Sequence, residues 1–215
     1  MIKVGITGGI GSGKSTVAKT FESEYGVPVY LMDNRIRYLI NTNKSLQFDI
    51  KLLIGADAFL PDGTYNSKMV AEIAFNDAEL LHSLNKCVEP YLIKDLNDFY
   101  QAMELGHSKY VLVEAAYFYE YDMQYLVDFM IGVNATLPVR LSRAQKRDGA
   151  TTDQIRARMK HQMEQDDKMK LCDFVVDNNE EFDKEALRKL DDHLIKIYKY
   201  GINIVCRTME HGVRR

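Results

Sequence analysis

The chain has 215 residues, of which 46% are hydrophobic and 27% are charged. This balance is typical of a folded globular protein and excludes an intrinsically disordered one. A formal net charge of −3 creates no field that would draw the chain to nucleic acid or to a membrane surface. The three cysteines are isolated from one another, which argues against a disulfide framework or a zinc site and favours a reducing compartment.

No apolar run approaches the roughly 20 residues that a membrane-spanning helix needs. The N-terminus reaches a glycine-rich loop at Gly8, which leaves no room for a signal peptide. We therefore expect a cytoplasmic protein that partners neither a membrane nor nucleic acid.

Short apolar segments alternate with longer helical patterns along the chain, which predicts an α/β fold with a central parallel sheet flanked by helices on both faces. Strands are expected at 2–7, 27–32, 109–118, 129–133 and 174–176. Helices are expected at 14–25, about 66–105, 136–147, 152–170 and 181–200. The stretch from about 34 to 90 departs from this alternation and suggests a helical insertion near one edge. The charged segment 144–170 fits either a mobile flap or a solvated helix.

The segment Gly8–Ser15 (GGIGSGKS) fits the pattern G-x-x-x-x-G-K-[ST] in full, between a predicted strand and a predicted helix. Glycines in such a loop let successive backbone N–H groups point at phosphate oxygens, and the helix N-terminus adds partial positive charge. Lys14 is expected to reach the β- and γ-phosphates, and the Ser15 hydroxyl to help hold Mg²⁺. The alternative is a glycine-rich turn with an incidental lysine. The complete pattern in this context favours binding of a nucleoside triphosphate.

Other segments of the chain indicate which class of nucleotide-dependent reaction to expect. The segment Asn43–Leu46 lacks the aspartate of the N-K-x-D pattern that GTPases use to recognise their base. A small P-loop chain with a helical insertion and an arginine-rich later segment fits a kinase of small metabolites. Such a kinase needs a phosphate cradle, a metal, a positioned acceptor hydroxyl and cations for the developing charge.

Two carboxylates are candidates for the chemistry. Asp33 follows the second predicted strand, where it could orient the acceptor hydroxyl and take its proton, or simply cap a helix that starts at Asn34. Glu114 lies in the third predicted strand, where it could hold a metal-bound water or be an interior carboxylate paired with a cation.

Five arginines fall within 19 residues of one another in the later part of the chain. Guanidinium groups suit transferring phosphates, although such a cluster also fits a solvated helix face. They are Arg140, Arg143, Arg147, Arg156 and Arg158.

In an ordered series of motifs over about residues 2–190, the chain resembles the dephospho-coenzyme A kinases. The matching segments are Val4–Thr16, Leu60–Asn66 with its Pro-Asp-Gly turn, Tyr110–Glu114 followed by Glu120, Arg143 and Arg147 with Asp148, Arg158–Gln162, and Cys172–Asn178. The resemblance implies transfer of a phosphoryl group from ATP, with Mg²⁺, to the ribose 3′-hydroxyl of dephospho-coenzyme A.

The resemblance also implies one P-loop kinase domain over 1–215, with a helical acceptor-binding insertion at about 34–105 and a lid at about 140–170. Catalytic roles fall on Lys14, Asp33, Arg143 and Arg147. ATP binding falls on Gly9, Gly11, Ser12, Gly13, Lys14, Ser15, Thr16 and Asn178, the last near the adenine, and metal binding on Ser15 and Glu114. Acceptor binding falls on Arg37, Glu89, Tyr117 and Glu120.

Three departures from the family pattern lie on the acceptor side. The family's Asp-x-Asp is Leu31-Met32-Asp33 here, its His-Pro is Glu89-Pro90, and its Pro-Leu-Leu is Ala116-Tyr117-Phe118. A kinase of another nucleotide-like acceptor, such as a deoxynucleoside monophosphate, is therefore the close alternative. A nucleotide-binding module without catalysis is disfavoured by the presence of Asp33 and the arginines. The tail 201–215 lies beyond the resemblance; its basic end could contact a partner or be a frayed surface tail.

Overall fold

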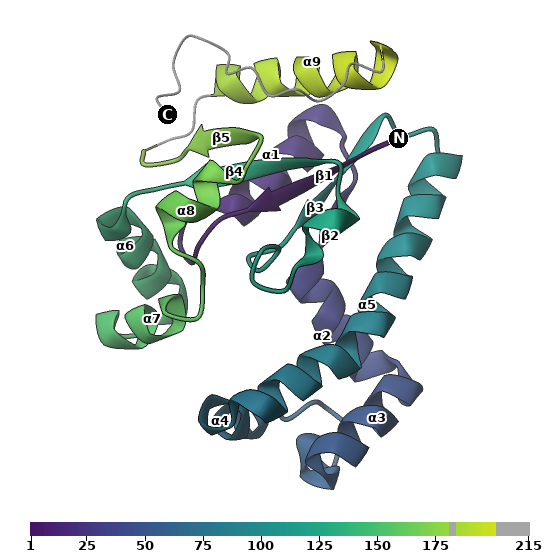
Figure 1. Ribbon diagram of the computed structural model, residues 1–215, viewed down its shortest axis with the longest axis vertical. Helices are drawn as coiled ribbons and strands as arrows, with labels where there is room; N and C mark the ends of the chain where they lie inside the picture. The colour runs from purple at the N-terminus through teal and green to yellow at the C-terminus, as the bar shows by residue number, and fades with distance from the viewer. Residues whose placement is uncertain (181–183, 201–215) are drawn as a thin grey trace. The chain divides into compact units, whose positions relative to one another are not determined.

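The computed structural model describes residues 1–180 and 184–200, which form a parallel sheet with flanking helices and a separate helical unit (Figure 1). Within these ranges five strands make one sheet in the order β2-β3-β1-β4-β5, and every pairing is parallel. The strands are β1 (Ile2–Thr7), β2 (Val29–Leu31), β3 (Tyr110–Glu114), β4 (Phe129–Asn134) and β5 (Phe174–Asp177). The α/β prediction is confirmed.

The chain divides into two compact units. The first joins residues 1–31 to the chain from 103 onward and contains the whole sheet. Its described helices are α1 (Lys14–Tyr25), α6 (Leu137–Asp148), α7 (Thr152–Met159), α8 (Gln165–Lys170) and α9 (Lys184–Tyr200), with a 3₁₀ turn η2 (Met123–Leu126).

The second unit, residues 32–102, is helical. It contains α2 (Met32–Thr42), α3 (Lys44–Ile54), a 3₁₀ turn η1 (Ala56–Ala58), α4 (Ser67–Asn76) and most of α5 (Ala78–Leu105). Its acceptor-binding role stays a prediction.

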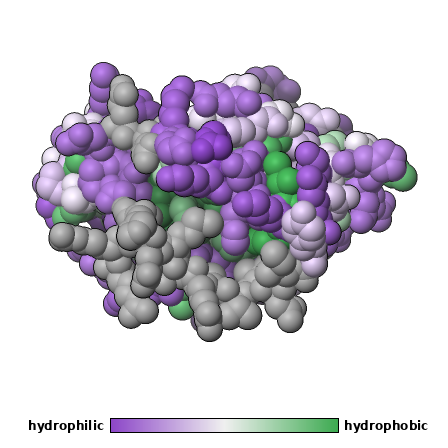
Figure 2. All heavy atoms as spheres, turned by 90° about the horizontal axis from the view of Figure 1, so that it is seen from above, coloured by the Kyte–Doolittle hydropathy of each residue, from purple (hydrophilic) through white to green (hydrophobic). Residues whose placement is uncertain are grey.

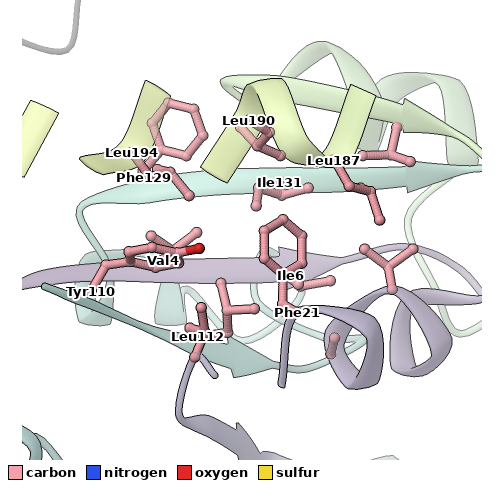
Figure 3. Packing of buried hydrophobic residues seen from close by; sticks show 14 of the residues in the cluster. Val4, Ile6, Phe21, Tyr110, Leu112, Phe129, Ile131, Leu187, Leu190 and Leu194 are labelled. Atoms are coloured by element: carbon pink, nitrogen blue, oxygen red, sulfur yellow. The ribbon is translucent and has the colours of Figure 1, made fainter. Parts of the chain in front are cut away.

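The main core covers one face of the sheet (Figure 3). Alternate strand residues point to opposite faces, so Val4 and Ile6 of β1 share this face with apolar side chains of β3 and β4. Leucines 187, 190 and 194 of α9 and Phe21 of α1 are fully buried against them. The spacing of these leucines gives α9 a single apolar stripe that faces the sheet. The surface of the molecule seen in Figure 2 is mostly hydrophilic where the chain is described.

The opposite face is covered in part by α8. Gly132 of β4 lies against the side chains of Met169 and Cys172, so closely that a methyl group at this glycine would clash with both sulfurs. A glycine in the strand therefore allows α8 to approach the sheet.

Several predicted boundaries were wrong for identifiable reasons. The second strand is only Val29–Leu31, and Met32 already begins α2. The third ends at Glu114 rather than 118, where its last pairs are formed with Leu31 of β2 on one side and Ile6 of β1 on the other.

Two long predicted helices are each divided. The stretch 66–105 breaks at Asp77, whose carboxylate accepts a hydrogen bond from the Leu80 N–H (2.9 Å) and starts α5. The stretch 152–170 breaks between α7 and α8, where the Met163 N–H donates to the Glu120 carboxylate (2.8 Å) instead of continuing a helix. The last predicted helix is α9; residues 181–183 of that prediction and the tail 201–215 lie outside the described residues.

Candidate active site

The phosphate-binding loop connects the central strand β1 to α1, as predicted (Figure 1). Because all the strands are parallel, the chain leaves β1, β3, β4 and β5 at the same edge of the sheet. Crevices at this carboxyl edge are where open α/β sheets bind ligands.

The second half of the loop presents unpaired backbone donors. Among the described residues, none accepts a hydrogen bond from the N–H groups of Gly11, Gly13, Lys14 or Ser15. No acidic side chain lies in the first turn of α1 to compete with an anion. This part of the loop can therefore donate to phosphate oxygens, assisted by the helix dipole.

The Lys14, Ser15 and Glu114 side chains meet beside the loop. The Ser15 hydroxyl donates to Glu114 Oε1 at 3.1 Å, and Lys14 Nζ lies 3.7 Å from the same oxygen. The Glu114 side chain is 5% exposed and that of Lys14 is 12% exposed. Both sequence interpretations of Glu114 fit this arrangement, since the carboxylate is paired with a cation and also adjoins the hydroxyl expected at a metal.

Three loop glycines are required by particular neighbours. A Cβ on Gly9 would collide with the Arg140 guanidinium, and one on Gly11 with the Arg140 carbonyl group. Gly13 has φ +92° and lies against the side-chain amide nitrogen of Asn178. Larger residues here would displace the groups that hold the loop.

The first half of the loop is held by two glutamines to which the sequence assigned no role and by Arg140, one of the clustered arginines. The N–H groups of Gly9 and Ile10 donate to the amide oxygens of Gln165 and Gln162, each at 2.9 Å. Arg140 Nε donates to the Ile10 carbonyl at 3.0 Å. Burial lowers the pKa of the Arg140 guanidinium, although arginine remains charged in proteins.

Asn178 and Arg143 fasten the other side of the loop. The Asn178 side chain donates to the Ser12 carbonyl at 2.8 Å, and the Asn178 carbonyl accepts from Arg143 at 2.7 Å. Arg143 also donates to the Glu180 carbonyl at 3.1 Å. The structure thus brings both residues to the loop, while their roles toward adenine and phosphate stay predictions.

Arg147 lies in the last turn of α6, where it is exposed and paired with its neighbour. Asp148 accepts from Arg147 Nε at 2.6 Å and from Arg158 of α7 at 2.5 Å. These two bonds hold the pKa of the Asp148 carboxyl well below its usual range. The pairing links the ends of α6 and α7 around Gly149, which has φ +64°.

Glu120, predicted to bind the acceptor, forms a buried ion pair with Lys168 of α8 at 2.7 Å. Lys168 is fully buried and also donates to the Ala116 carbonyl at 2.7 Å. Burial lowers the pKa of this ammonium, and the nearby Lys14 charge lowers it further. Tyr117, the other acceptor residue predicted in this segment, packs its ring on Tyr121 with centroids 5.6 Å apart.

Three of the remaining candidates lie in the helical unit. Asp33 and Arg37 are exposed on α2, and Glu89 lies on α5, where its carboxylate accepts from Lys86 at 2.8 Å. Asp33 is the second residue of α2, so the alternative that it caps a helix starting at Asn34 is wrong. Thr16, which follows the loop, is exposed in α1.

Among the described residues no group of three or more His, Cys, Asp or Glu side chains is arranged to hold a metal ion. Of the described helices, none combines the length and apolar character that a membrane span requires.

The chain has a phosphate-binding loop with open N–H groups, a lysine–serine pair and a buried acid, on a parallel sheet with flanking helices. Together these features define a P-loop kinase. The dephospho-CoA kinase family profile matches residues 2–184. The chain therefore belongs to the dephospho-CoA kinase family, which confirms the predicted family.

Curated relatives and solved structures agree with this assignment. The chain is 32% identical over 185 residues to a dephospho-CoA kinase of Listeria innocua, covering 84% of this chain and 90% of the relative. It is 32% identical to one of Mannheimia succiniciproducens, covering 83% and 82%.

Among solved structures, TT1252 from Thermus thermophilus superposes with a TM-score of 0.75 at 26% identity, covering 94% of this chain and 98% of that one. A dephospho-CoA kinase from Campylobacter jejuni has a TM-score of 0.61 at 20% identity, covering 93% and 98%, and supports the fold.

Proposed function

We propose that this kinase transfers the γ-phosphoryl group of ATP to the ribose 3′-hydroxyl of dephospho-coenzyme A, giving coenzyme A and ADP. The observation that carries the proposal is the family match across residues 2–184, with the phosphate loop complete at its start. A nucleoside monophosphate as acceptor is not favoured, because the curated relatives named above are dephospho-CoA kinases.

ATP is proposed to bind with its phosphates along Gly11, Ser12, Gly13, Lys14, Ser15 and Thr16. The open N–H groups, the helix dipole and the Lys14 charge would offset the negative charge of the β- and γ-phosphates. Asn178, which follows β5 and is hydrogen-bonded to the loop, is proposed to lie toward the adenine.

Mg²⁺ fits the residues at the loop. The Ser15 hydroxyl and the Glu114 carboxylate are hard oxygen donors 3.1 Å apart, the kind of ligand that Mg²⁺ prefers, either directly or through water. Bound there with ATP, the ion would neutralise charge on the phosphates.

Asp33 is proposed as the general base. The acceptor oxygen attacks the γ-phosphorus while the bond from that phosphorus to the β,γ-bridging oxygen breaks, and the hydroxyl proton passes to the Asp33 carboxylate. Its position two residues after β2 supports the role, since β2 ends at the carboxyl edge of the sheet. Arg143 and Arg147 are proposed to neutralise the transferring group.

Acceptor binding is proposed for Arg37, Glu89, Tyr117 and Glu120. Arg37 is exposed and carries the positive charge that an acceptor phosphate needs. Glu120 would act indirectly, because its Oε1 already accepts hydrogen bonds from Lys168 and from the Met163 N–H.

The cytoplasm is proposed as the compartment, and no nucleic acid is expected as a partner. Cys87 and Cys172 are free thiols, which suits a reducing environment, and the net charge of −3 does not favour a polyanion.

The test is the mass of the product formed from ATP, Mg²⁺ and dephospho-coenzyme A, with nucleoside monophosphates as alternative acceptors. Gain of one phosphate on dephospho-coenzyme A, lost in Lys14→Ala, is the expected result. Asp33→Asn should lower turnover by roughly 10²–10⁴-fold while ATP still binds. Transfer only to another acceptor would overturn the proposed substrate, and near-normal turnover of Asp33→Asn would overturn its role as base.

A further inference from the structure

The helices α6 and α7 form a hairpin whose two ends are tied to one residue of the phosphate loop. Arg140, near the start of α6, donates to the Ile10 carbonyl at 3.0 Å. Gln162, just after α7, accepts from the Ile10 N–H at 2.9 Å. The chain between them, residues 141–161, carries Arg143 and Arg147.

The Ile10 side chain joins the same hairpin. It packs against a small apolar cluster made by Leu141, Ala144 and Ile155, which is separate from the main core. All three parts of this loop residue, the N–H, the carbonyl and the side chain, therefore contact the hairpin or its ends.

The Gln162 side chain links the hairpin to the loop from a buried position. It is a buried side chain, 8% exposed, whose amide oxygen reaches a backbone group 152 positions earlier. The Ile10 N–H is partly buried, and such a group without an acceptor is unfavourable, so the amide oxygen favours one orientation of the Ile10 peptide. The same peptide is followed by the unpaired N–H donors of Gly11, Gly13, Lys14 and Ser15, which are proposed to bind the phosphates.

We propose that Gln162 is a positioning residue that couples the phosphate loop to the arginine-bearing hairpin. When the phosphates of ATP order the loop, the Ile10 peptide fixes the ends of the hairpin and thereby aims its arginines at the transferring group. Gln162 touches neither ATP nor acceptor in this role; it acts through Ile10.

The role toward transfer rests on the proposed function, but the coupling itself is measurable with ATP alone. Hydrogen–deuterium exchange of the wild-type protein should show protection of residues 141–161 when a non-hydrolysable ATP analogue binds. In Gln162→Leu, which removes the acceptor oxygen, the analogue should still bind within about threefold of wild-type affinity, because the N–H donors of Gly11, Gly13, Lys14 and Ser15 remain. Protection of the hairpin should be lost.

Kinetics give a second readout. Gln162→Leu should lower kcat with dephospho-coenzyme A roughly tenfold, leave the KM for ATP nearly unchanged, and raise the share of ATP hydrolysed without transfer. Gln162→Glu keeps an acceptor oxygen for the Ile10 N–H and should restore both hairpin protection and the transfer-to-hydrolysis ratio.

Gln154→Leu is the matched control. Gln154 lies in the same hairpin, where its amide oxygen accepts from the Thr151 N–H at 2.9 Å as part of a helix cap; among the described residues it makes no hydrogen bond to the loop. Gln154→Leu should lower thermal stability, while the ATP analogue should still protect residues 141–161 from hydrogen exchange. Equal protection in Gln162→Leu and wild type, or equal loss in Gln154→Leu, would overturn the coupling. Absence of transfer to dephospho-coenzyme A by the wild type would instead refute the proposed substrate.

Discussion

Replacing Glu114 by glutamine tests the charge relation at the centre of the site. The change is nearly isosteric and keeps an acceptor for the Ser15 hydroxyl, but it removes the negative charge 3.7 Å from Lys14. Coulomb's law with an effective dielectric constant of about 20 gives roughly 4 kcal/mol of attraction at that distance. Because the buried carboxylate also costs desolvation, we expect a net loss of about 2 kcal/mol without ligand.

For a chain of this size that loss corresponds to a fall in Tm of roughly 4–8 °C. Mg²⁺-free ATP should restore part of the lost Tm in Glu114→Gln, because its phosphates supply the negative charge beside Lys14. In this variant the phosphates are also not repelled by a carboxylate at position 114. Glu114→Gln should therefore bind Mg²⁺-free ATP more tightly than wild type, yet gain little from added Mg²⁺ and lose at least about tenfold in kcat.

Thermal unfolding and calorimetric ATP titration, each with Mg²⁺ and with EDTA, measure these differences. Glu104→Gln is the control, since its carboxylate is 72% exposed and lies 3.8 Å from the N-terminal amine; its Tm should change little. An unchanged Tm together with weaker Mg²⁺-free ATP binding in Glu114→Gln would refute the reasoning.

Two further substitutions test the loop and the hairpin. Gly13→Ala, at φ +92° and against the Asn178 amide, should lower Tm and weaken ATP binding at least roughly tenfold by calorimetry, and unchanged binding would contradict the packing. Asp148→Asn should lower Tm at pH 7. Hydrogen bonds from Arg147 and Arg158 lower the pKa of Asp148 in the folded protein. Its carboxylate therefore contributes its full share of folding stability above the pKa of the unfolded chain, and that share is lost as the pH falls through the pKa of the folded protein. Tm scans from pH 7 to 2 should show the two proteins converging, and a pH-independent difference would exclude this electrostatic origin.

Local patterns predicted the fold and the phosphate loop well. The β1–loop–α1 unit is recognisable because apolar residues, glycines and a helical period follow one another within 25 residues. Gly26, in the left-handed conformation, ends α1 at the boundary of the helix predicted over 14–25. Such features depend on neighbours in the chain, so they can be read without the tertiary structure.

The residues that hold the loop could not be predicted in the same way. Gln165 bonds to a backbone group 156 positions away, and a glutamine that accepts such a bond has the same local pattern as one facing solvent. The burial of Lys168 was equally hard to predict, because a lysine in a charged segment is expected to be exposed. Its ammonium is instead buried against the Glu120 carboxylate and the Ala116 carbonyl. Arg140 was visible only as one member of an arginine cluster. For Gln162, the family-like Arg-x-x-x-Gln spacing was the available signal.

The place of β1 at the centre of the sheet has a consequence during synthesis. Its two neighbours are β3 and β4, which begin at Tyr110 and Phe129, after the whole helical unit has been made. During synthesis β1 is thus apolar and unpaired on both edges until β3 and β4 have been made, and such edges invite aggregation. The helical unit, rich in contacts between near neighbours, can form meanwhile. The nucleotide site is consequently completed only when the segment that carries Gln162, Gln165 and Asn178 joins a loop made more than 150 residues earlier.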